Sequence, residues 1–402
     1  MNQPYPLFVT GTARSGTTLL SYMLNAHPNM MLAIDPFLPL FRSFRNAVIR
    51  ESGDAHLRAV FDPASALSDY YFDDDRLRML EAIQTSDLDI RFDQSEWDVF
   101  YSASLSRIQI ECGDLAPHLK RLRCADYRQM FDRALEILAQ ARNVTTRPWV
   151  GFKEVWIIEF FAPLARAYPQ ARFIVIQRDP RAVLASLLAL ARRDVSQKAH
   201  VLSYLRHWRK YAAFVLHYRN HPLLINRMHI LKYEDLVSEP ERSAQQLCGF
   251  LDIPFEPAML DSGNYVDYTT GKTWEGNSSF EEALKGISAA PLEQWQDELE
   301  TSVVKTVEFI CGPEMTLEDY QPITAPIGCP GDADVLEYLM RDNLEACSWR
   351  SDFGNLQLDY GFELFRRALL EARGDKDPNL VRRSFLFEEV YARLRKMEVG
   401  TA

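Results

Sequence analysis

The sequence predicts an α/β protein built on a P-loop-like parallel sheet that is flanked by helices. Two observations carry this prediction. Short apolar runs that suit buried strands alternate with runs of helical periodicity, which is typical of a parallel sheet covered on both faces. The first apolar run ends at Val9 in a Gly-rich turn that leads into a helical run from Leu19, and a strand, a turn and a helix N-terminus in that order form an anion site.

Five segments have the length and composition of buried strands. They are Tyr5–Val9, Asn29–Ile34, Trp149–Lys153, Arg172–Gln177 and His229–Lys232. The second segment is followed by Asp35 and Pro36, and a proline stops a strand because it lacks the N–H that the ladder needs.

Helical patterns follow the strands. The predicted helices cover Leu19–Leu24, Ile157–Tyr168, Arg181–Leu190, Leu205–Tyr218 and Ala244–Phe250. Asp179 offers an N-cap ahead of Pro180, which suits the first helical position. The run Ser238-Glu-Pro-Glu241 has the spacing of a capping box for the last of these helices.

Two large blocks lie outside this alternation. The block from about 37 to 147 reads as a helical insertion, with helices expected over Leu38–Ile49, Arg76–Ile83 and Tyr127–Ala141. The segment from 313 to 332 is rich in Pro, Gly and Thr and suits a linker, after which the pattern is helical again to about 397. We therefore expect an α/β domain over 1–312 and a helical C-terminal extension over 313–402. The extension suits a solvated cap on the sheet best, and a lid or a homodimer surface otherwise.

Composition limits the classes of partner. The chain has 402 residues and a net charge of −11, so neither nucleic acid nor an anionic membrane is indicated as a partner. The six cysteines (112, 124, 248, 311, 329 and 347) contain no Cys-x-x-Cys pair, which favours reduced thiols over a zinc site. The first predicted strand begins close to Met1 and no run has the length of a membrane span, so we expect no signal peptide and a cytoplasmic protein.

The Gly-rich turn has the spacing of a Walker A loop. Gly11-x-x-x-x-Gly16 matches, but the position of the essential lysine is taken by Thr17. A nucleoside triphosphatase needs that lysine on its β- and γ-phosphates, so the turn suits a 5′-phosphate group rather than a triphosphate. Arg14 supplies positive charge within the turn. Gly-rich turns that bind nothing are also common, and the residues Arg-Ser-Gly-Thr-Thr argue against that interpretation here.

Polar side chains stand at the ends of all five predicted strands. They are Arg14, Asp35, Lys153, Arg178 and Tyr233. Ligands of open parallel α/β sheets bind beyond the carboxyl ends of the strands, so we expect these side chains to share one site. Each also has a plain structural interpretation: Asp35 suits a helix cap, Lys153 a surface ion, and Arg178 a partner for Glu154 or Asp179.

Four motifs together resemble the sulfotransferases that use 3′-phosphoadenosine 5′-phosphosulfate (PAPS), in the branch with carbohydrate and tyrosylprotein sulfotransferases and many bacterial relatives. The motifs are Arg14-Ser-Gly-Thr-Thr-Leu-Leu, Asn25-Ala-His-Pro28, Arg178-Asp-Pro-Arg181 with Ser186, and Tyr233-Glu-Asp-Leu236. The resemblance covers roughly 5–35, 148–190 and 228–280. It implies a sulfotransferase fold, PAPS as co-substrate and an acceptor that carries a hydroxyl group.

The resemblance also implies roles for individual residues. The loop Arg14, Ser15, Gly16, Thr17 and Thr18 would cradle the 5′-phosphosulfate, while Arg178 and Ser186 would hold the 3′-phosphate. Eight residues apart, that pair can face one ligand if the arginine precedes a helix and the serine lies two turns into it. Tyr233 joins the cofactor-binding residues. Lys272, in the loop-like segment Gly263–Gly286 that also holds Asn277 and Ser278, matches the family's late loop over the nucleotide more loosely.

The implied catalytic residues are Asp35, Lys153 and Arg14. In-line attack of a hydroxyl on sulfur leaves little covalent work to the protein, so positioning and charge stabilisation dominate. Asp35 would take the hydroxyl proton, and Lys153 and Arg14 would neutralise charge near sulfur; no metal is expected. The family usually has Glu where this chain has Asp35, so His27 remains open as an alternative base.

Two other functions remain open at this stage. A P-loop small-molecule kinase would keep the fold, although Thr17 argues against it. A non-catalytic interaction protein that retains a nucleotide-binding scaffold is the second. The acceptor, most simply a carbohydrate or small natural product, is expected on the side of the insertion. Aromatic residues there are expected mainly in the core, and Arg42, Arg45, Arg50 and Arg58 suit either an anionic acceptor or solvent.

Overall fold

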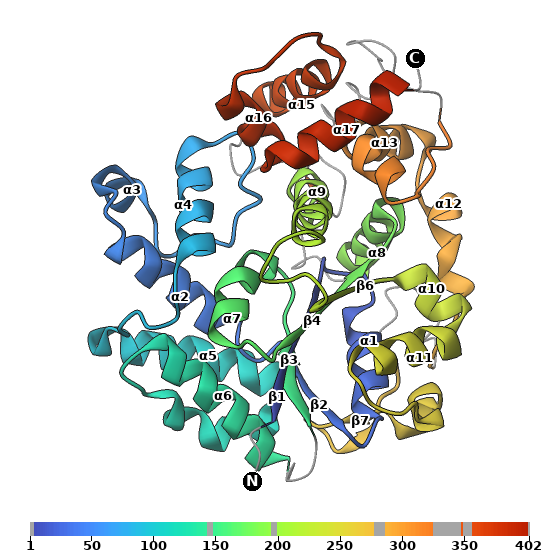
Figure 1. Cartoon of the computed structure of the whole chain (residues 1–402). Helices are drawn as coiled ribbons and strands as arrows, with labels where there is room; N and C mark the ends of the chain where they lie inside the picture. Colours follow the sequence, from blue (N-terminus) through green and yellow to red (C-terminus); the bar gives the residue numbers. More distant parts are fainter. Residues whose placement is uncertain are drawn as a thin grey trace.

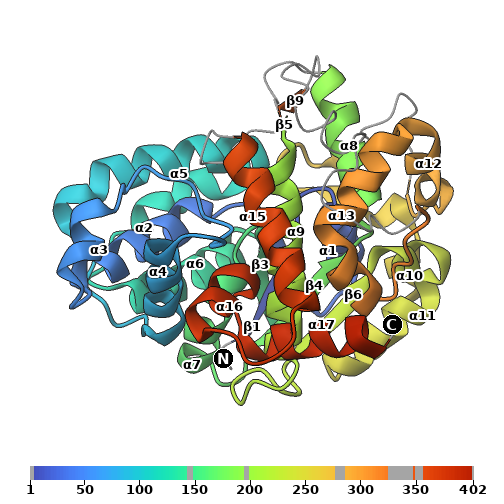
Figure 2. The same cartoon turned by 90° about the horizontal axis from the view of Figure 1, so that it is seen from above.

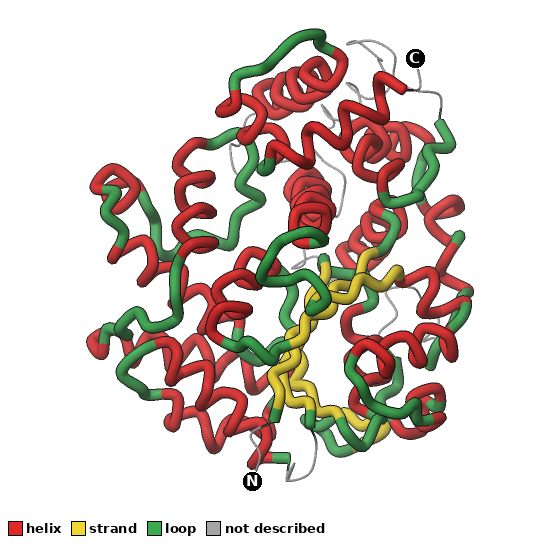
Figure 3. The backbone as a smooth tube through the Cα atoms, viewed as in Figure 1, coloured by secondary structure: helices red, strands yellow, loops and turns green. Residues whose placement is uncertain are grey.

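The structure is a computed structural model that describes residues 4–142, 148–193, 199–276, 286–324, 347–348 and 356–400. A five-stranded parallel sheet runs through the centre and helices surround it (Figure 1, Figure 3). The predicted fold class is therefore confirmed.

The sheet has the strand order β2-β3-β1-β4-β6, and every pairing in it is parallel. Its strands are β1 (Tyr5–Gly11), β2 (Met30–Ile34), β3 (Trp149–Lys153), β4 (Arg172–Gln177) and β6 (Met228–Lys232). The predicted strand bounds agree within two residues. Because neighbouring strands are parallel, their carboxyl ends lie at one edge: Ile34 pairs with Lys153, and Gln177 pairs with Lys232.

Helices cover both faces of the sheet, as the continuous apolar strands require. Leu7 and Val9 of β1 face a core shared with α1 (Thr17–Asn25) and α11 (Pro240–Phe250). Phe8, between them, points to the opposite face and a larger core. The alternation along β1 therefore separates two apolar layers.

The larger layer includes the insertion, which is helical as predicted. Its helices are α2 (Leu38–Glu51), α3 (Ala55–Val60), α4 (Asp74–Thr85), α5 (Trp97–Glu111) and α6 (Tyr127–Ala141). Phe37, Phe41 and Phe44 are buried in this core, as expected for most of the aromatic residues. Arg45 is also fully buried and donates to the carbonyls of residues 63, 65 and 66, so it neither meets solvent nor faces an acceptor.

The remaining helices of the α/β part follow β3, β4 and β6. They are α7 (Phe161–Ala167), α8 (Pro180–Arg193), α9 (Val201–Tyr218), α10 (Tyr233–Ser238), α12 (Gln294–Glu298) and α13 (Thr301–Leu317). Asp179 accepts a hydrogen bond from the Arg181 N–H at the start of α8, as predicted. The predicted capping box is wrong: Ser238 is the last residue of α10, and α11 begins at Pro240 with Glu239 as an N-cap whose side chain makes no capping bond.

The helices that follow residue 355 are α15 (Leu356–Glu371), α16 (Pro378–Phe385) and α17 (Glu388–Gly400). Figure 2 shows α15 lying along α9, and the contact between them is charged and buried. Arg206 of α9 is 2.9 Å from Asp359 and 2.8 Å from Glu363, while Arg209 is 2.5 Å from Glu363. The sequence favoured a solvated cap, whereas these charges are fully desolvated.

The predicted linker is partly wrong. Helix α13 continues through Pro313 to Leu317, so the first residues of that segment are helical. Most of the rest, from residue 325, lies outside the described residues. The division of the chain between 312 and 313 stays a prediction. Two short strand pairs complete the structure: β5 (Ala199–His200) with β9 (Cys347–Ser348), and β7 (Val266–Asp267) with β8 (Lys272–Thr273).

Candidate active site

The turn between β1 and α1 has the geometry of an anion-binding loop. Arg14 and Gly16 both have left-handed backbones, with φ of 67° and 90°. The Ser15 hydroxyl is turned inward and donates to the Thr12 carbonyl at 2.7 Å. Gly16 is the N-cap of α1 and no side chain caps this helix, so the N–H groups of its first turn remain available to a ligand.

Tyr233 packs directly against this loop. A Cβ atom added to Gly16 would lie 2.3 Å from Cδ2 of the Tyr233 ring. Arg178 also packs over the ring, with its guanidinium carbon 4.3 Å from the ring centre. Glycine is therefore required at position 16 both for its φ and for the close approach of Tyr233.

Two arginines and a serine meet beside the loop. Arg14 Nε donates to Ser186 Oγ at 3.0 Å, and Arg178 Nη1 donates to the Arg14 carbonyl at 3.0 Å. Burial, together with the charge of Arg178, lowers the pKa of Arg14 to about 10. Arg178 itself makes no ion pair in the described part of the chain, and its buried Nε has no hydrogen-bond partner there. Arg14 and Arg178 therefore concentrate positive charge beside the loop, and within the described residues no carboxylate forms an ion pair with Arg178.

The sequence left open whether Arg178 pairs with Glu154 or Asp179. It binds neither: its other side-chain bond is to the Pro291 carbonyl at 3.4 Å. Asp179 instead pairs with Arg181 at 2.7 Å.

At the neighbouring strand ends, Asp35 and Lys153 form a buried ion pair. The Asp35 N–H donates to the Lys153 carbonyl at 2.7 Å, which continues the register of β2 and β3 by one residue. Asp35 also has a left-handed backbone, with φ of 51°. A non-glycine residue in this region is strained, and such strain is concentrated at functional sites.

Two charged residues that lie beside this pair, Arg107 and Glu154, were not predicted as members of the site. Arg107 of α5 reaches Asp35 from the insertion, with its Nε 2.8 Å from the Asp35 carbonyl. Glu154 is fully buried and accepts from the Phe37 N–H, and burial followed by the charge of Asp35 raises its pKa well above the usual value. Neither lies in a recognisable motif, although Glu154 directly follows Lys153.

His27, the alternative base, has no free ring nitrogen. Its Nε2 is 2.8 Å from the Pro254 carbonyl oxygen, and its Nδ1 accepts from the Asn29 N–H at 2.9 Å. The ring is fully buried. These contacts give His27 a structural role.

Lys272 is not brought into contact with the other predicted site residues. It is exposed in β8, and its ammonium makes no ion pair with the described residues. The segment is anchored by Trp274, which stacks on Tyr22 of α1 with ring centres 4.6 Å apart. Asn277 and Ser278 lie outside the described residues. The nucleotide role of Lys272 stays a prediction.

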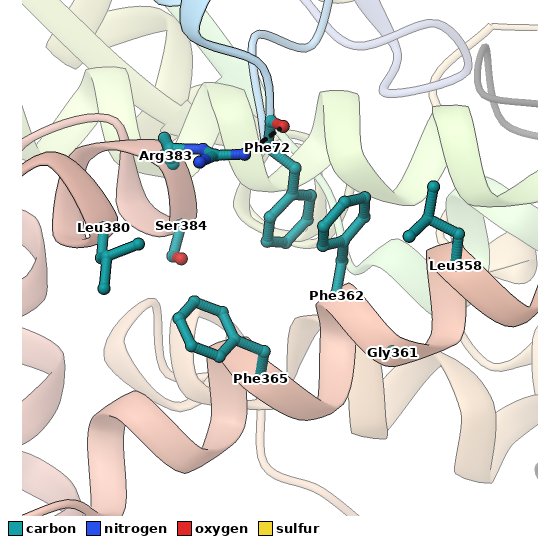
Figure 4. A pocket seen from close by; sticks show the side chains of 8 residues that line it. All are labelled: Phe72, Leu358, Gly361, Phe362, Phe365, Leu380, Arg383 and Ser384. Atoms are coloured by element: carbon teal, nitrogen blue, oxygen red, sulfur yellow. Dashed lines mark hydrogen bonds between the residues drawn. The ribbon is translucent and has the colours of Figure 1, made fainter.

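A separate pocket lies among the C-terminal helices. It has a volume of about 410 Å³ and is lined mainly by apolar side chains of α15 and α16 together with Phe72 (Figure 4). Phe362 and Phe72 stack at 4.8 Å, while Arg383 donates to the Phe72 carbonyl at 3.2 Å. None of the predicted site residues lines it.

Metal clusters and membrane spans are both absent from the described residues. No group of three or more His, Cys, Asp or Glu side chains there is arranged to hold a metal ion. No helix in the same part of the chain is long and apolar enough to cross a membrane. The four cysteines with described side chains, Cys112, Cys124, Cys248 and Cys311, are free thiols.

Fold and site together define an α/β protein with a Gly-rich loop of Walker A spacing, a second cationic group beside it and a carboxylate–lysine pair at the same sheet edge. Comparison with known families gives this class its name. The family model described as Sulfotransferase family matches residues 6–257, and the chain belongs to this family.

Known members are related at low identity. Protein-tyrosine sulfotransferase of Drosophila melanogaster is 22% identical over 332 residues, which cover 81% of this chain and 54% of that protein. Carbohydrate sulfotransferase 3 of Homo sapiens is 26% identical over 223 residues, which cover 51% of this chain and 44% of that protein. The chain thus spans about half the length of these relatives. Among solved structures, the sulfotransferase domain from the curacin biosynthetic pathway has 15% identity and a TM-score of 0.45, covering 80% of this chain and 99% of that domain.

Proposed function

We propose that this chain transfers a sulfuryl group from PAPS to a hydroxyl group of an acceptor. The observation that carries the proposal is the hydrogen bond between Arg14 and Ser186. It joins the loop to α8, so one nucleotide could place its 5′-phosphosulfate on the loop and its 3′-phosphate near Ser186. This arrangement suits a bisphosphorylated nucleoside better than a triphosphate.

The residues present fit such a ligand. Arg178 is buried without an ion pair among the described residues, and a buried cation of this kind is stabilised when an anion binds beside it. The uncapped N-terminus of α1 adds backbone donors for a second anionic group. Arg14 lies in the loop just before α1 and is hydrogen-bonded to both Arg178 and Ser186.

The proposed reaction is a direct displacement at sulfur. The acceptor oxygen forms a bond to sulfur, while the bond from sulfur to the bridging oxygen of the 5′-phosphate breaks. Asp35 takes the acceptor proton, and adenosine 3′,5′-bisphosphate leaves with the bridging electron pair. Lys153 and Arg14 stabilise the charge that develops near sulfur, and fixed charges placed before the reaction are effective in such a site.

The acceptor is proposed to be a carbohydrate or a small natural product. The buried aromatic residues of the insertion cannot contact it, so we consider two half-buried rings outside the insertion, Trp156 and Tyr204. Trp156, three residues after Lys153, has a φ of 70° and contacts Tyr204 with ring centres 5.7 Å apart. The charge of Arg14 influences Tyr204, whose pKa is raised by burial. We propose this ring pair as one wall of the acceptor site.

The decisive experiment combines binding with turnover. Thermal unfolding is measured with adenosine 3′,5′-bisphosphate and, separately, with ATP and magnesium; the proposal expects stabilisation by the bisphosphate alone. Sulfuryl transfer from radiolabelled PAPS is then measured over a panel of sugars, phenols and alcohols. Preferential stabilisation by ATP would favour the kinase alternative. Binding of the bisphosphate without transfer to any hydroxyl would favour a non-catalytic protein.

A further inference from the structure

Asp35 is held at each of its polar atoms. Its N–H donates to the Lys153 carbonyl, and its carboxylate Oδ2 accepts from Lys153 Nζ. Its Oδ1 is 3.4 Å from the Val155 N–H and 3.7 Å from Arg107 Nη2, and its carbonyl accepts from Arg107 Nε at 2.8 Å. A left-handed aspartate persists only where its surroundings determine its conformation, and these contacts do so.

Arg107 stands out among these partners because it comes from outside the sheet. It lies on α5, and both of its hydrogen-bonded or ionic contacts in the described structure are to Asp35, 72 residues earlier in the chain. Its side chain is 30% exposed, whereas the neighbouring Ser104 and Ile108 of α5 are buried. The helix is thus anchored in the insertion core, and it holds the guanidinium over Asp35.

We propose that Arg107 is a positioning residue for the transfer reaction, which sets the backbone and carboxylate of Asp35 for proton abstraction. The inference rests on the proposed function. Its physical basis is the short aspartate side chain: with one methylene fewer than glutamate, the position of the carboxylate depends more directly on the backbone. Arg107 fixes that backbone through the Asp35 carbonyl, and its planar guanidinium can contact the carboxylate at the same time.

The inference also concerns charge. The charged groups that face Asp35 are Lys153 and Glu154 from β3 and its end, and Arg107 from α5. A cation beside a carboxylate favours its ionised form. Removal of Arg107 should therefore move the acidic limb of the pH–rate profile to higher pH, an effect that a purely structural role in α5 would not produce.

The test compares Arg107→Gln with Arg107→Lys. We expect Arg107→Gln to lower kcat roughly 10- to 100-fold with little change in the KM for PAPS, because the donor site is separate. Arg107→Lys should return the acidic limb towards its original pH, since the charge is kept, but not restore kcat fully, since the Nε contact is lost.

The control is Arg133→Gln on α6, a half-exposed arginine paired with Glu136. Wild-type kcat and an unmoved limb in Arg107→Gln, or equal changes in Arg133→Gln, would overturn the inference.

A second measurement separates this inference from the proposed function. The urea midpoints of Arg107→Gln, Asp35→Asn and the double variant require no acceptor. We expect Asp35→Asn to lower the urea midpoint much less in the Arg107→Gln background than in the wild-type chain, because the two residues share one interaction. If the two substitutions change the urea midpoint additively and the wild-type chain transfers sulfuryl groups, the Arg107 inference alone is overturned. If the effects of the two substitutions on the midpoint are coupled but the wild-type chain transfers no sulfuryl group, the proposed function is overturned, and with it the role of Arg107 in catalysis.

Discussion

Arg14 Nε donates to Ser186 Oγ at 3.0 Å across 172 residues of sequence, and this bond connects the two predicted phosphate sites. Replacement of Ser186 by Ala should weaken binding of adenosine 3′,5′-bisphosphate roughly 10- to 100-fold, because a hydrogen bond to a charged group is lost. Calorimetry with AMP, which lacks the 3′-phosphate, should show little change. Ser238→Ala, on the surface of α10, is the control. Equal losses for both nucleotides would mean that Ser186 acts only through Arg14.

Arg178→Met should separate binding from stability. The side chain is buried without an ion pair among the described residues, so replacing it with an apolar chain should change the free energy of unfolding by no more than about 1 kcal/mol. Bisphosphate affinity should fall by roughly 100-fold or more and become less sensitive to salt. Both quantities are measured by thermal unfolding with and without ligand. Arg192→Met, at the exposed end of α8, should leave both unchanged.

Gly16→Ala should damage the loop itself. The new Cβ would collide with the Tyr233 ring, and a φ of 90° is strained for alanine, so we expect a loss of roughly 2 kcal/mol in the free energy of unfolding together with weaker nucleotide binding. Gly249→Ala in α11 is the matched control. No atom lies within 4 Å of its added Cβ, and alanine favours a helix over glycine by up to about 1 kcal/mol. If Gly16→Ala is as stable as wild type, neither the left-handed backbone nor the Tyr233 ring restricts this position to glycine.

Asp35→Asn tests the proposed base. Turnover should fall by roughly 10²- to 10⁴-fold, the usual contribution of a general base, while bisphosphate binding stays within a few-fold of wild type. Asp35→Glu keeps a carboxylate and should retain more activity than Asp35→Asn. Initial rates with saturating PAPS provide the measurement. Nearly intact turnover in Asp35→Asn would exclude this residue as the base.

Glu363 should make stability depend on acid pH. Burial opposes its charge, but Arg209 and Arg206 outweigh burial and lower its pKa from 4.5 to about 2. Since the folded-state pKa is below the unfolded value, its stabilisation is fully present above about pH 4.5 and is lost as the pH falls towards 2, by about 3 kcal/mol. Urea unfolding from pH 7 to pH 3 measures this slope.

The same carboxylate can be removed by Glu363→Gln. This variant should be destabilised by about 3–5 kcal/mol at pH 7, because the buried Arg209 loses its carboxylate partner and Arg206 keeps only Asp359. Its stability should decline less between pH 5 and pH 3. Glu371→Gln, at the exposed end of the same helix, should behave as wild type. If the free energy of unfolding of Glu363→Gln falls with pH as steeply as that of the wild type, other carboxylates cause the loss of stability in acid.

Local patterns predicted the sheet correctly. Apolar runs such as Arg172–Gln177 and the Gly-rich turn at Gly16 act over a few residues, so their signals are contained in the sequence near them. The approach of Asp35 to Lys153 also followed, since parallel strands bring their carboxyl ends to one edge. The predicted capping box at Ser238 is wrong because Ser238 is the last residue of α10, and tertiary structure overrides local helix-capping preferences.

The sequence by itself determined the parallel fold, the Gly-rich turn before α1 and the strand-end residues, because period, turn chemistry and strand direction are local properties. Only the tertiary structure decided that Arg14 meets Ser186 and that Arg107 holds Asp35. It also decided that the charges of α9 are buried against α15. These contacts join residues separated by 72 or more positions, and they depend on how whole helices pack and on which charges that packing removes from water.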